Sequence, residues 1–286
     1  MPCRPLRPAV DRCAALLCAA LAGCAAARPD ADSMPASTWW HDARNEQTAA
    51  CRATLATLRD DLAQSPTTSL MVAHGHDVVF SYGPVDHATA INSARKSLLA
   101  MLYGNPVEQG SIRLDDTLAT LGVDDLGGLL PIEREARVRD LLAARSGVYH
   151  PAANPGDNSA AAPPRGSQPP GSYFLYNNWD FNAAGDIYEQ LTHRDIYQAF
   201  AEDIATPLGL EDFRVGREHR SGDATRSIHL AYHFHLSARD MARIGADSAD
   251  ARSRPQACGR LAVRRVAVKG CGAALEQLAK NPSLRG

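Results

Sequence analysis

The segment that most constrains the fold of this chain covers residues 93–104 and reads SARKSLLAMLYG. It is apolar on most of its faces, which predicts a helix buried in a core. Asn92 or Ser93 can cap the start of this helix, and Gly104 can end it. A buried helix needs other layers of structure around it, and 286 residues suffice for one large domain or two small ones.

The lysine inside this segment is unusual for the chain. Only three of the 30 basic residues are lysines, namely Lys96, Lys269 and Lys280, so every other basic residue in the first 268 positions is arginine. Arginine stays charged at working pH and cannot accept a proton. Lysine can accept one when burial and nearby positive charge lower its pKa. We therefore interpret Lys96 as a candidate base.

A serine stands at the spacing that such a base needs. Ser93 lies three residues before Lys96, and residues at this spacing share one face of a helix. The start of a helix also offers unpaired N–H groups and the positive end of the dipole, which stabilise an oxyanion. The pair predicts Ser93 as a nucleophile and Lys96 as its base. The alternative is a capping serine followed by a solvated lysine.

A second polar motif lies in residues 173–182, which read YFLYNNWDFN. Within it, Tyr176 and Asn178 form a Y-x-N pattern. A phenol that faces the Ser–Lys pair can pass a proton to a leaving group, and the amide can bind substrate or hold the lysine. Taken alone, the segment is more typical of an aromatic core stretch with polar turn residues.

In this order, the motifs resemble the class C β-lactamase-related serine hydrolases, which include D-alanyl-D-alanine carboxypeptidases, esterases and amide hydrolases. The resemblance covers about residues 50–245 and rests on Ser93-x-x-Lys96, Tyr176-x-Asn178 and the segments 141–147, 207–210 and 236–241.

The resemblance implies an α+β fold of the β-lactamase/transpeptidase type. An antiparallel sheet containing residues 69–82 is flanked by helices, a helical lobe lies beside it, and the site lies between the two. By the same resemblance Ser93 is the acylated nucleophile, Lys96 its base, Tyr176 a second acid/base, and Asn178 a ligand to Lys96 or substrate. The implied substrate is an ester, a β-lactam or a D-amino-acid peptide of peptidoglycan type, and neither a metal nor an organic cofactor is implied.

One family motif is missing. The family carries a Lys-Thr-Gly or His-x-Gly motif on a late strand, and the nearest candidate is Lys269-Gly270-Cys271-Gly272. Residues 246–286 form an atypical tail without family motifs, so we expect a domain that is incomplete at its C-terminus. The alternative to a hydrolase is therefore a non-catalytic envelope lipoprotein that retains the fold.

The N-terminus predicts export. Arginines precede a short apolar stretch that ends in Leu-Ala-Gly-Cys24, which resembles a bacterial lipobox. We expect residues 1–23 to be a signal peptide, Cys24 to carry the lipid, residues 24–45 to be a tether, and residues 46–245 to form the hydrolase domain. The membrane is then a partner through the lipid anchor and the location is periplasmic. The rival interpretation is cleavage after Ala25-Ala26-Ala27, which releases a free periplasmic protein.

Other classes of function find little support. The formal net charge of −2 gives no indication of a nucleic-acid partner. His233 and His235 are one residue apart, but no third metal ligand stands at a suitable spacing. The remaining patterns predict a hairpin over residues 69–82, helices over 45–64, 137–144, 182–191 and 196–204, a surface loop over 151–172, and a helix capped by Ser237.

Overall fold

The computed structural model describes residues 39–156 and 160–253. Its strands are β1 (His41–Asp42), β2 (Leu70–His74), β3 (Asp77–Tyr82), β4 (Thr89–Ala90), β5 (His219–Ser221), β6 (Ala231–His233) and β7 (His235–Leu236). Its helices are α1 (Ala49–Ala63), α2 (Arg95–Glu108), α3 (Leu118–Leu121), α4 (Pro131–Arg134), α5 (Val138–Leu142), α6 (Asn178–Thr192), α7 (Ile196–Phe200), α8 (Thr206–Leu208) and α9 (Ala238–Ser253). Among the described residues, no helix combines the length and apolar character that a membrane span requires.

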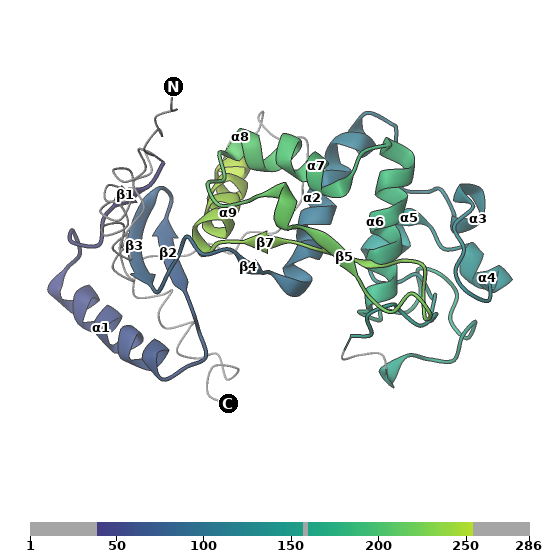
Figure 1. The fold of residues 1–286 in the computed structure, drawn as a ribbon, viewed down its shortest axis with the longest axis horizontal. Coiled ribbons are helices and arrows are strands. Elements are labelled where there is room, and N and C mark those ends of the chain that lie inside the picture. Colours follow the sequence, from purple (N-terminus) through teal and green to yellow (C-terminus); the bar gives the residue numbers. More distant parts are fainter. Residues whose placement is uncertain (1–38, 157–159, 254–286) are drawn as a thin grey trace, which may run out of the picture.

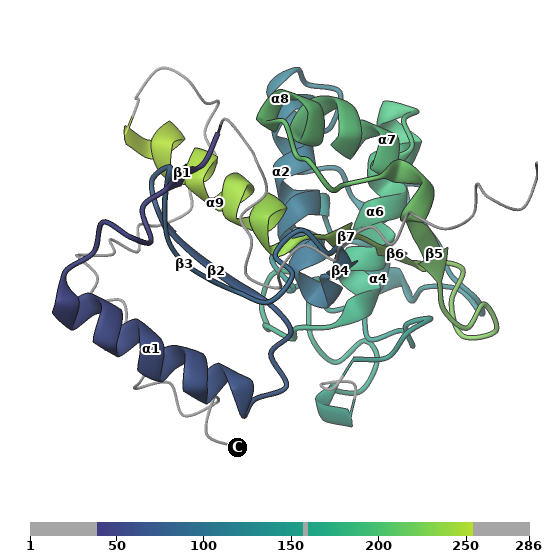
Figure 2. The same ribbon diagram turned by 60° about the vertical axis from the view of Figure 1, so that its left-hand side comes forward.

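A small sheet with helices on two sides forms one part of the molecule. Strands β2 and β3 pair antiparallel, as predicted, and β1 adds to β3 in parallel. Helix α1 packs on β3 through a cluster that includes Leu55, Leu62 and Phe80, while α9 contacts β2. Figure 2 shows the sheet between these two helices. The hairpin turn needs Gly75, whose φ of 61° is unfavourable for residues with a side chain.

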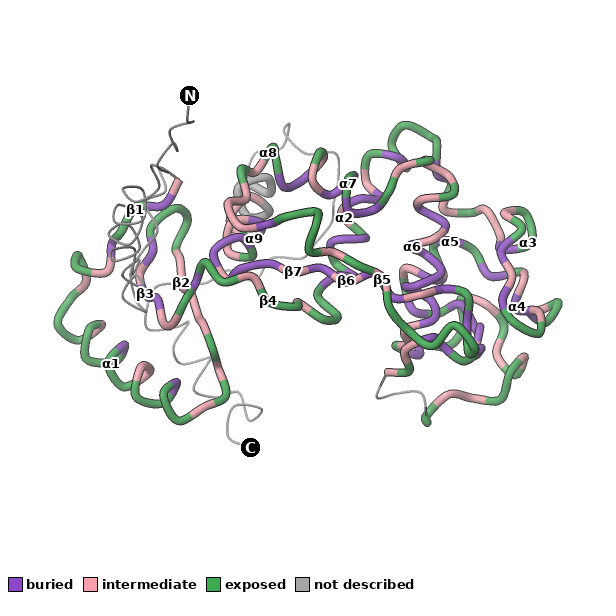
Figure 3. Tube along the Cα trace, viewed as in Figure 1, coloured by how far each residue is buried: buried purple, intermediate pink, exposed green. Residues whose placement is uncertain are grey.

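The larger hydrophobic core lies in a helical lobe beside the sheet. Its centre is formed by α2 and α6, which contact each other and α7 (Figure 1). Leu99 on α2 and Trp179, Ile187 and Tyr188 on α6 are almost completely buried. Figure 3 shows that the buried positions run along both helices. Helix α2 is therefore covered on most sides, as its apolar sequence predicted.

Two short strand pairs bring distant segments to the start of α2. Strand β4 pairs with β7, and Ile91 N–H donates to the carbonyl of Phe234 at 3.0 Å. Strand β6, which pairs with β5, packs closely against α6. A Cβ atom on Gly185 of α6 would lie 2.7 Å from a ring carbon of Tyr232. Glycine at this position allows the ring to lie directly on the helix.

The predicted ends of the central helix are wrong at both sides. Ser93 lies in a 3₁₀ turn (Asn92–Ala94), and neither this turn nor α2 has a side-chain cap at its start. Gly104 lies inside α2, which continues to Glu108. The glycine that adopts a left-handed conformation after the helix is Gly110, with φ of 77°. A glycine inside a helix weakens it only slightly, and the tertiary packing of α2 outweighs this cost.

The helices predicted later in the chain differ from the observed ones mainly in where they begin and end. The helix expected over residues 182–191 begins earlier, at Asn178, because the Asn177 side chain accepts a hydrogen bond from Asp180 N–H and caps it. The helix expected over residues 196–204 is divided into α7 and a π-turn (Ala201–Ala205). Ser237 caps α9 as predicted, since its hydroxyl accepts from Asp240 N–H at 3.1 Å.

Candidate active site

The candidate nucleophile stands on a sharp turn between β4 and α2. Asn92, which precedes it, has a positive φ of 46°, a conformation that asparagine tolerates better than most residues. Ser93 is exposed, whereas Lys96 is only 5% exposed. The turn therefore presents a hydroxyl to solvent while the amine one helical turn later is buried beneath it.

The Lys96 amine is in contact with three side-chain oxygens. Its Nζ lies 3.0 Å from Ser93 Oγ, 2.8 Å from the Tyr176 hydroxyl and 2.8 Å from Asn178 Oδ1. None of these groups is a carboxylate. A neutral amine has two N–H donors and one lone pair, so it can donate to two of these oxygens and accept a proton from the third.

The role of Asn178 in this arrangement follows from its second hydrogen bond. Its Nδ2 donates to the backbone carbonyl of Asn154 at 2.7 Å, which orients Oδ1 toward the amine. An amide oxygen can only accept, so Lys96 uses one N–H on Asn178. The lone pair of a neutral Lys96 is therefore directed to Ser93 or Tyr176, both of which carry a transferable proton.

Burial and charge both act on the proton affinity of this pair. Burial lowers the pKa of Lys96, and the positive charge of Arg95 lowers it further, against an opposing effect of the hydrogen bond with Tyr176. Burial raises the pKa of Tyr176, but its hydrogen bonds with Lys96 and Ser93 outweigh this and leave a net lowering. Both shifts favour proton exchange within the group.

The same turn offers a donor for a developing negative charge. In residues 39–156 and 160–253, the Ser93 N–H makes no hydrogen bond. It lies at the N-terminal end of α2, where the helix dipole is positive. When Ser93 Oγ attacks a carbonyl carbon, the oxyanion that develops would find this N–H within the same residue.

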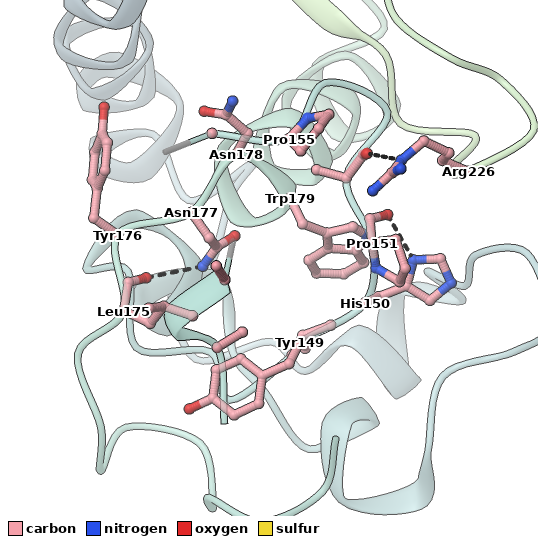
Figure 4. A pocket seen from close by; sticks show the side chains of 15 residues that line it. Tyr149, His150, Pro151, Pro155, Leu175, Tyr176, Asn177, Asn178, Trp179 and Arg226 are labelled. Atoms are coloured by element: carbon pink, nitrogen blue, oxygen red, sulfur yellow. Dashed lines mark hydrogen bonds between the residues drawn. The ribbon is translucent and has the colours of Figure 1, made fainter. Parts of the chain in front are cut away.

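A cavity of about 310 Å³ adjoins the polar group. Tyr176 and Asn178 line it together with apolar and aromatic side chains such as Leu175 and Trp179. Figure 4 shows Tyr176 at one end of the cavity and Arg226 at the other. The site thus combines a reactive polar group with neighbouring space for an apolar substituent.

The structure brings together the four residues that the sequence singled out in this domain, namely Ser93, Lys96, Tyr176 and Asn178. Cys24 and the segment Lys269-Gly270-Cys271-Gly272 lie outside the described residues. Sequence reasoning missed Asn154, which holds Asn178. It lies in a loop rich in proline and alanine, where no periodic pattern marks one polar residue as special.

No metal centre is evident at the histidines. The pairing of β5 with β6 places His219 beside His233, and His235 follows on β7. The ring centroid of His219 lies 5.1 Å from that of His233 and 5.8 Å from that of His235. The rings stack rather than converge on a point. Within the described residues, no group of three or more histidines, cysteines or acidic residues could hold a metal ion.

Comparison with known proteins defines the family. A sequence model of the family "Beta-lactamase" matches residues 55–279, most of the chain, and the chain therefore belongs to that family. This confirms the resemblance inferred from the motifs. The match also extends beyond Gly245, where the resemblance seen in the sequence ends.

Solved structures show the same fold. The crystal structure of SurE aligns with a TM-score of 0.51 and 23% identity, covering 73% of this chain and 56% of SurE. The octameric penicillin-binding protein homologue from Pyrococcus abyssi aligns with a TM-score of 0.51 and 18% identity, covering 71% of this chain and 57% of the homologue. The predicted β-lactamase/transpeptidase-like α+β fold is thereby confirmed.

A relative of known activity matches a smaller part of the chain. Monacolin J acid methylbutanoyltransferase from Aspergillus terreus is 27% identical over 166 residues, which cover 48% of this chain and 40% of the fungal protein. The chain thus spans less than half the length of this relative and little more than half the length of the two solved structures.

Proposed function

We propose that this chain is a serine hydrolase that works through an acyl-enzyme on Ser93. The observation that carries the proposal is the distance of 3.0 Å between Lys96 Nζ and Ser93 Oγ, with the amine buried and without a carboxylate partner in the described residues. An amine so placed is able to take the hydroxyl proton. Membership of the β-lactamase family supports the same conclusion.

The acylation step follows from the geometry. Ser93 Oγ attacks the carbonyl carbon of an ester or amide while its proton passes to Lys96 Nζ, and the carbonyl oxygen becomes an oxyanion near Ser93 N–H. When the C–O or C–N bond breaks, the leaving group takes a proton from the Tyr176 hydroxyl, which is restored from Lys96 across 2.8 Å. Water then attacks the acyl-enzyme by the same proton route in reverse and releases the acid.

The substrate we propose is a small acyl compound or a peptidoglycan-like D-amino-acid peptide. The cavity beside Tyr176 and Asn178 supports a substrate that carries an apolar substituent next to its reactive carbonyl. A panel of p-nitrophenyl esters of increasing chain length, a chromogenic cephalosporin and a D-alanyl-D-alanine peptide would rank these classes by kcat/KM.

Covalent labelling tests the proposal. A fluorescent fluorophosphonate or a fluorescent penicillin should label the full chain, and Ser93→Ala should abolish the label. Ser97→Ala is the matched control, because Ser97 lies on the same helix but is exposed, and among the described residues the Lys96 amine bonds to Ser93, Tyr176 and Asn178 and not to Ser97. A folded protein that reacts with neither probe would leave a non-catalytic envelope protein as the better interpretation.

Transfer of the acyl group to an alcohol is a second candidate. The similarity to a methylbutanoyltransferase favours it, because such an enzyme passes an acyl group to an acceptor other than water. Adding increasing concentrations of an alcohol to an ester assay and separating acid from new ester would distinguish the two. Without a dedicated acceptor site, the ratio of new ester to acid should rise in proportion to the alcohol concentration, with the same slope as in the uncatalysed reaction. That result would exclude such a site.

We also propose that the chain is exported and attached to the membrane through Cys24. Support comes from the lipobox-like sequence alone. Expression in a Gram-negative host with an alkyne-labelled fatty acid should label the wild type and Cys18→Ala, but not Cys24→Ala. Labelling of all three variants, or of none, would contradict the lipid anchor.

A further inference from the structure

Arg95, which precedes Lys96, is a buried cation that has no counter-ion within residues 39–156 and 160–253. It is 3% exposed, and its Nη2 donates to Asn182 Oδ1 at 2.7 Å. Its guanidinium lies over the ring of Tyr232, 4.2 Å from the centroid. Nη1 has no hydrogen-bond partner, and no ion pair of Arg95 occurs among the residues described. Asp186, a carboxylate on the same helix as Asn182, does not pair with Arg95 but with Arg220 and His229.

A guanidinium buried in this way is expected to lower the stability of the fold, so its presence calls for an explanation other than stability. Removing an arginine from water carries a large desolvation cost, which stays uncompensated when no carboxylate pairs with it. A neutral side chain of similar size would pack against Tyr232 and Asn182 at lower cost. The remaining consequence of the charge is its field, which acts on the neighbouring Lys96.

Asn182 holds Arg95 and Asn178 holds Lys96, and both asparagines are hydrogen-bonded to Asn154. Asn182 Nδ2 donates to Asn154 Oδ1 at 2.9 Å, which leaves Asn182 Oδ1 free to accept from Arg95. The backbone carbonyl of Asn154 holds Asn178, whose Oδ1 accepts from Lys96. The position of the charge relative to the amine is therefore fixed by one connected set of hydrogen bonds.

Resting on the proposed function, we propose that Arg95 is a positioning residue whose uncompensated charge keeps the Lys96 amine in its neutral, proton-accepting form. Among the described groups that face this pair, only Tyr176 opposes the effect of Arg95, because its hydrogen bond and its charge raise the pKa of Lys96. Tyr176 is a phenol from the loop before α6, and Tyr232 and His233 come from β6. The field of Arg95 lowers the pKa of His233 as well, after the larger effects of burial and of His219.

The rarity of lysine makes a direct test practical. With [13C-ε]lysine the whole chain gives three labelled side chains, and Lys96→Arg identifies the Lys96 signal. Arg95→Gln removes the charge but retains an amide that can donate to Asn182, whereas Arg95→Lys retains the charge. We expect Arg95→Gln to raise the titration midpoint of Lys96 by about one pH unit, and Arg95→Lys to stay close to the wild type. If Arg95→Gln does not fold, Arg95→Met serves as the neutral variant.

Labelling rates give the second readout. In Arg95→Gln the acidic limb of the pH profile for fluorophosphonate labelling should move to higher pH, with about ten-fold slower labelling on that limb and an unchanged plateau at high pH. A uniform decrease at all pH values, or an unchanged Lys96 midpoint in a folded neutral variant, would overturn the proposal. If the wild type does not label but the Lys96 midpoint still shifts, the hydrolase proposal fails while the effect of Arg95 stands.

Discussion

The hydroxyl of Tyr176 lies 2.8 Å from the amine of Lys96, although 80 residues separate them in the sequence. The two groups come from different parts of the helical lobe, since Lys96 is on α2 and Tyr176 precedes α6. Their contact depends on the packing of these two helices. In the proposed mechanism, this contact is the route by which the proton of Lys96 reaches a leaving group.

Tyr176→Phe should therefore impair reactions according to the leaving group. An alkyl ester or an amide needs a proton on its leaving atom, so kcat/KM should fall roughly 10²–10⁴-fold. A p-nitrophenyl ester releases a stable anion and should be much less affected. Steady-state assays of both substrates on the same preparation measure the ratio, and an equal loss for both would contradict the proton-donor role.

Replacing Lys96 should stop acylation whether or not the charge is retained. Lys96→Ala removes the base, and Lys96→Arg retains a positive charge that cannot accept a proton, so both should slow fluorophosphonate labelling roughly 10²–10⁴-fold. The labelling rate at several pH values measures this, with circular dichroism as the control for folding. Wild-type labelling by Lys96→Arg would show that the charge, not proton acceptance, is what the site requires.

Asp180 should make stability depend on pH. Its carboxyl group is buried on α6, accepts from Ser146 Oγ at 2.5 Å, and has one oxygen without a partner. Burial raises its pKa from 3.8 to about 7, against the opposing hydrogen bond from Ser146. The folded state then binds a proton that the unfolded state has released between about pH 4 and 7, so stability falls as pH rises through this range.

Asp180→Asn should remove this contribution. The free energy of unfolding of the wild type, measured by urea titration from pH 4 to 7, should fall relative to Asp180→Asn by about 1.4 kcal/mol per pH unit. The difference should level off above the folded-state pKa. Parallel pH profiles of the two proteins would contradict a raised pKa at Asp180.

Gly185 should be intolerant of a side chain. A Cβ there would lie 2.7 Å from Tyr232, the ring that supports Arg95, so Gly185→Ala should lower the free energy of unfolding by about 1–3 kcal/mol. Gly216→Ala is the matched control, because a Cβ at that position has no atom within 4 Å. Equal stability of the two variants in urea would show that β6 can move away from α6 at little cost.

The sequence predicted those parts of the site that depend on local spacing. The contact of Ser93 with Lys96 follows from one helical turn, and the hairpin of β2 and β3 follows from its turn and flanking apolar residues. The meeting of Tyr176 with Lys96 was predictable only from the family resemblance, because no local pattern reports a contact across 80 residues.

The remaining features depend on tertiary structure. Strands β4 and β7 have two residues each, too few for a recognisable alternation. Gly104 resembles a helix end but is held inside α2 by the surrounding core. The orientation of Arg95 toward Asn182 and Tyr232 depends on α6 and β6, neither of which is local to it.

The most direct test of the account is to locate the acyl group itself. The protein would be mixed with p-nitrophenyl butyrate, quenched in acid within seconds and digested with trypsin, which cleaves after Arg59 and Arg95. We predict a butanoyl group on Ser93 within the peptide of residues 60–95, absent from Ser93→Ala and present in Ser97→Ala. A folded, ester-cleaving protein that carries no acyl group on Ser93 would contradict the account.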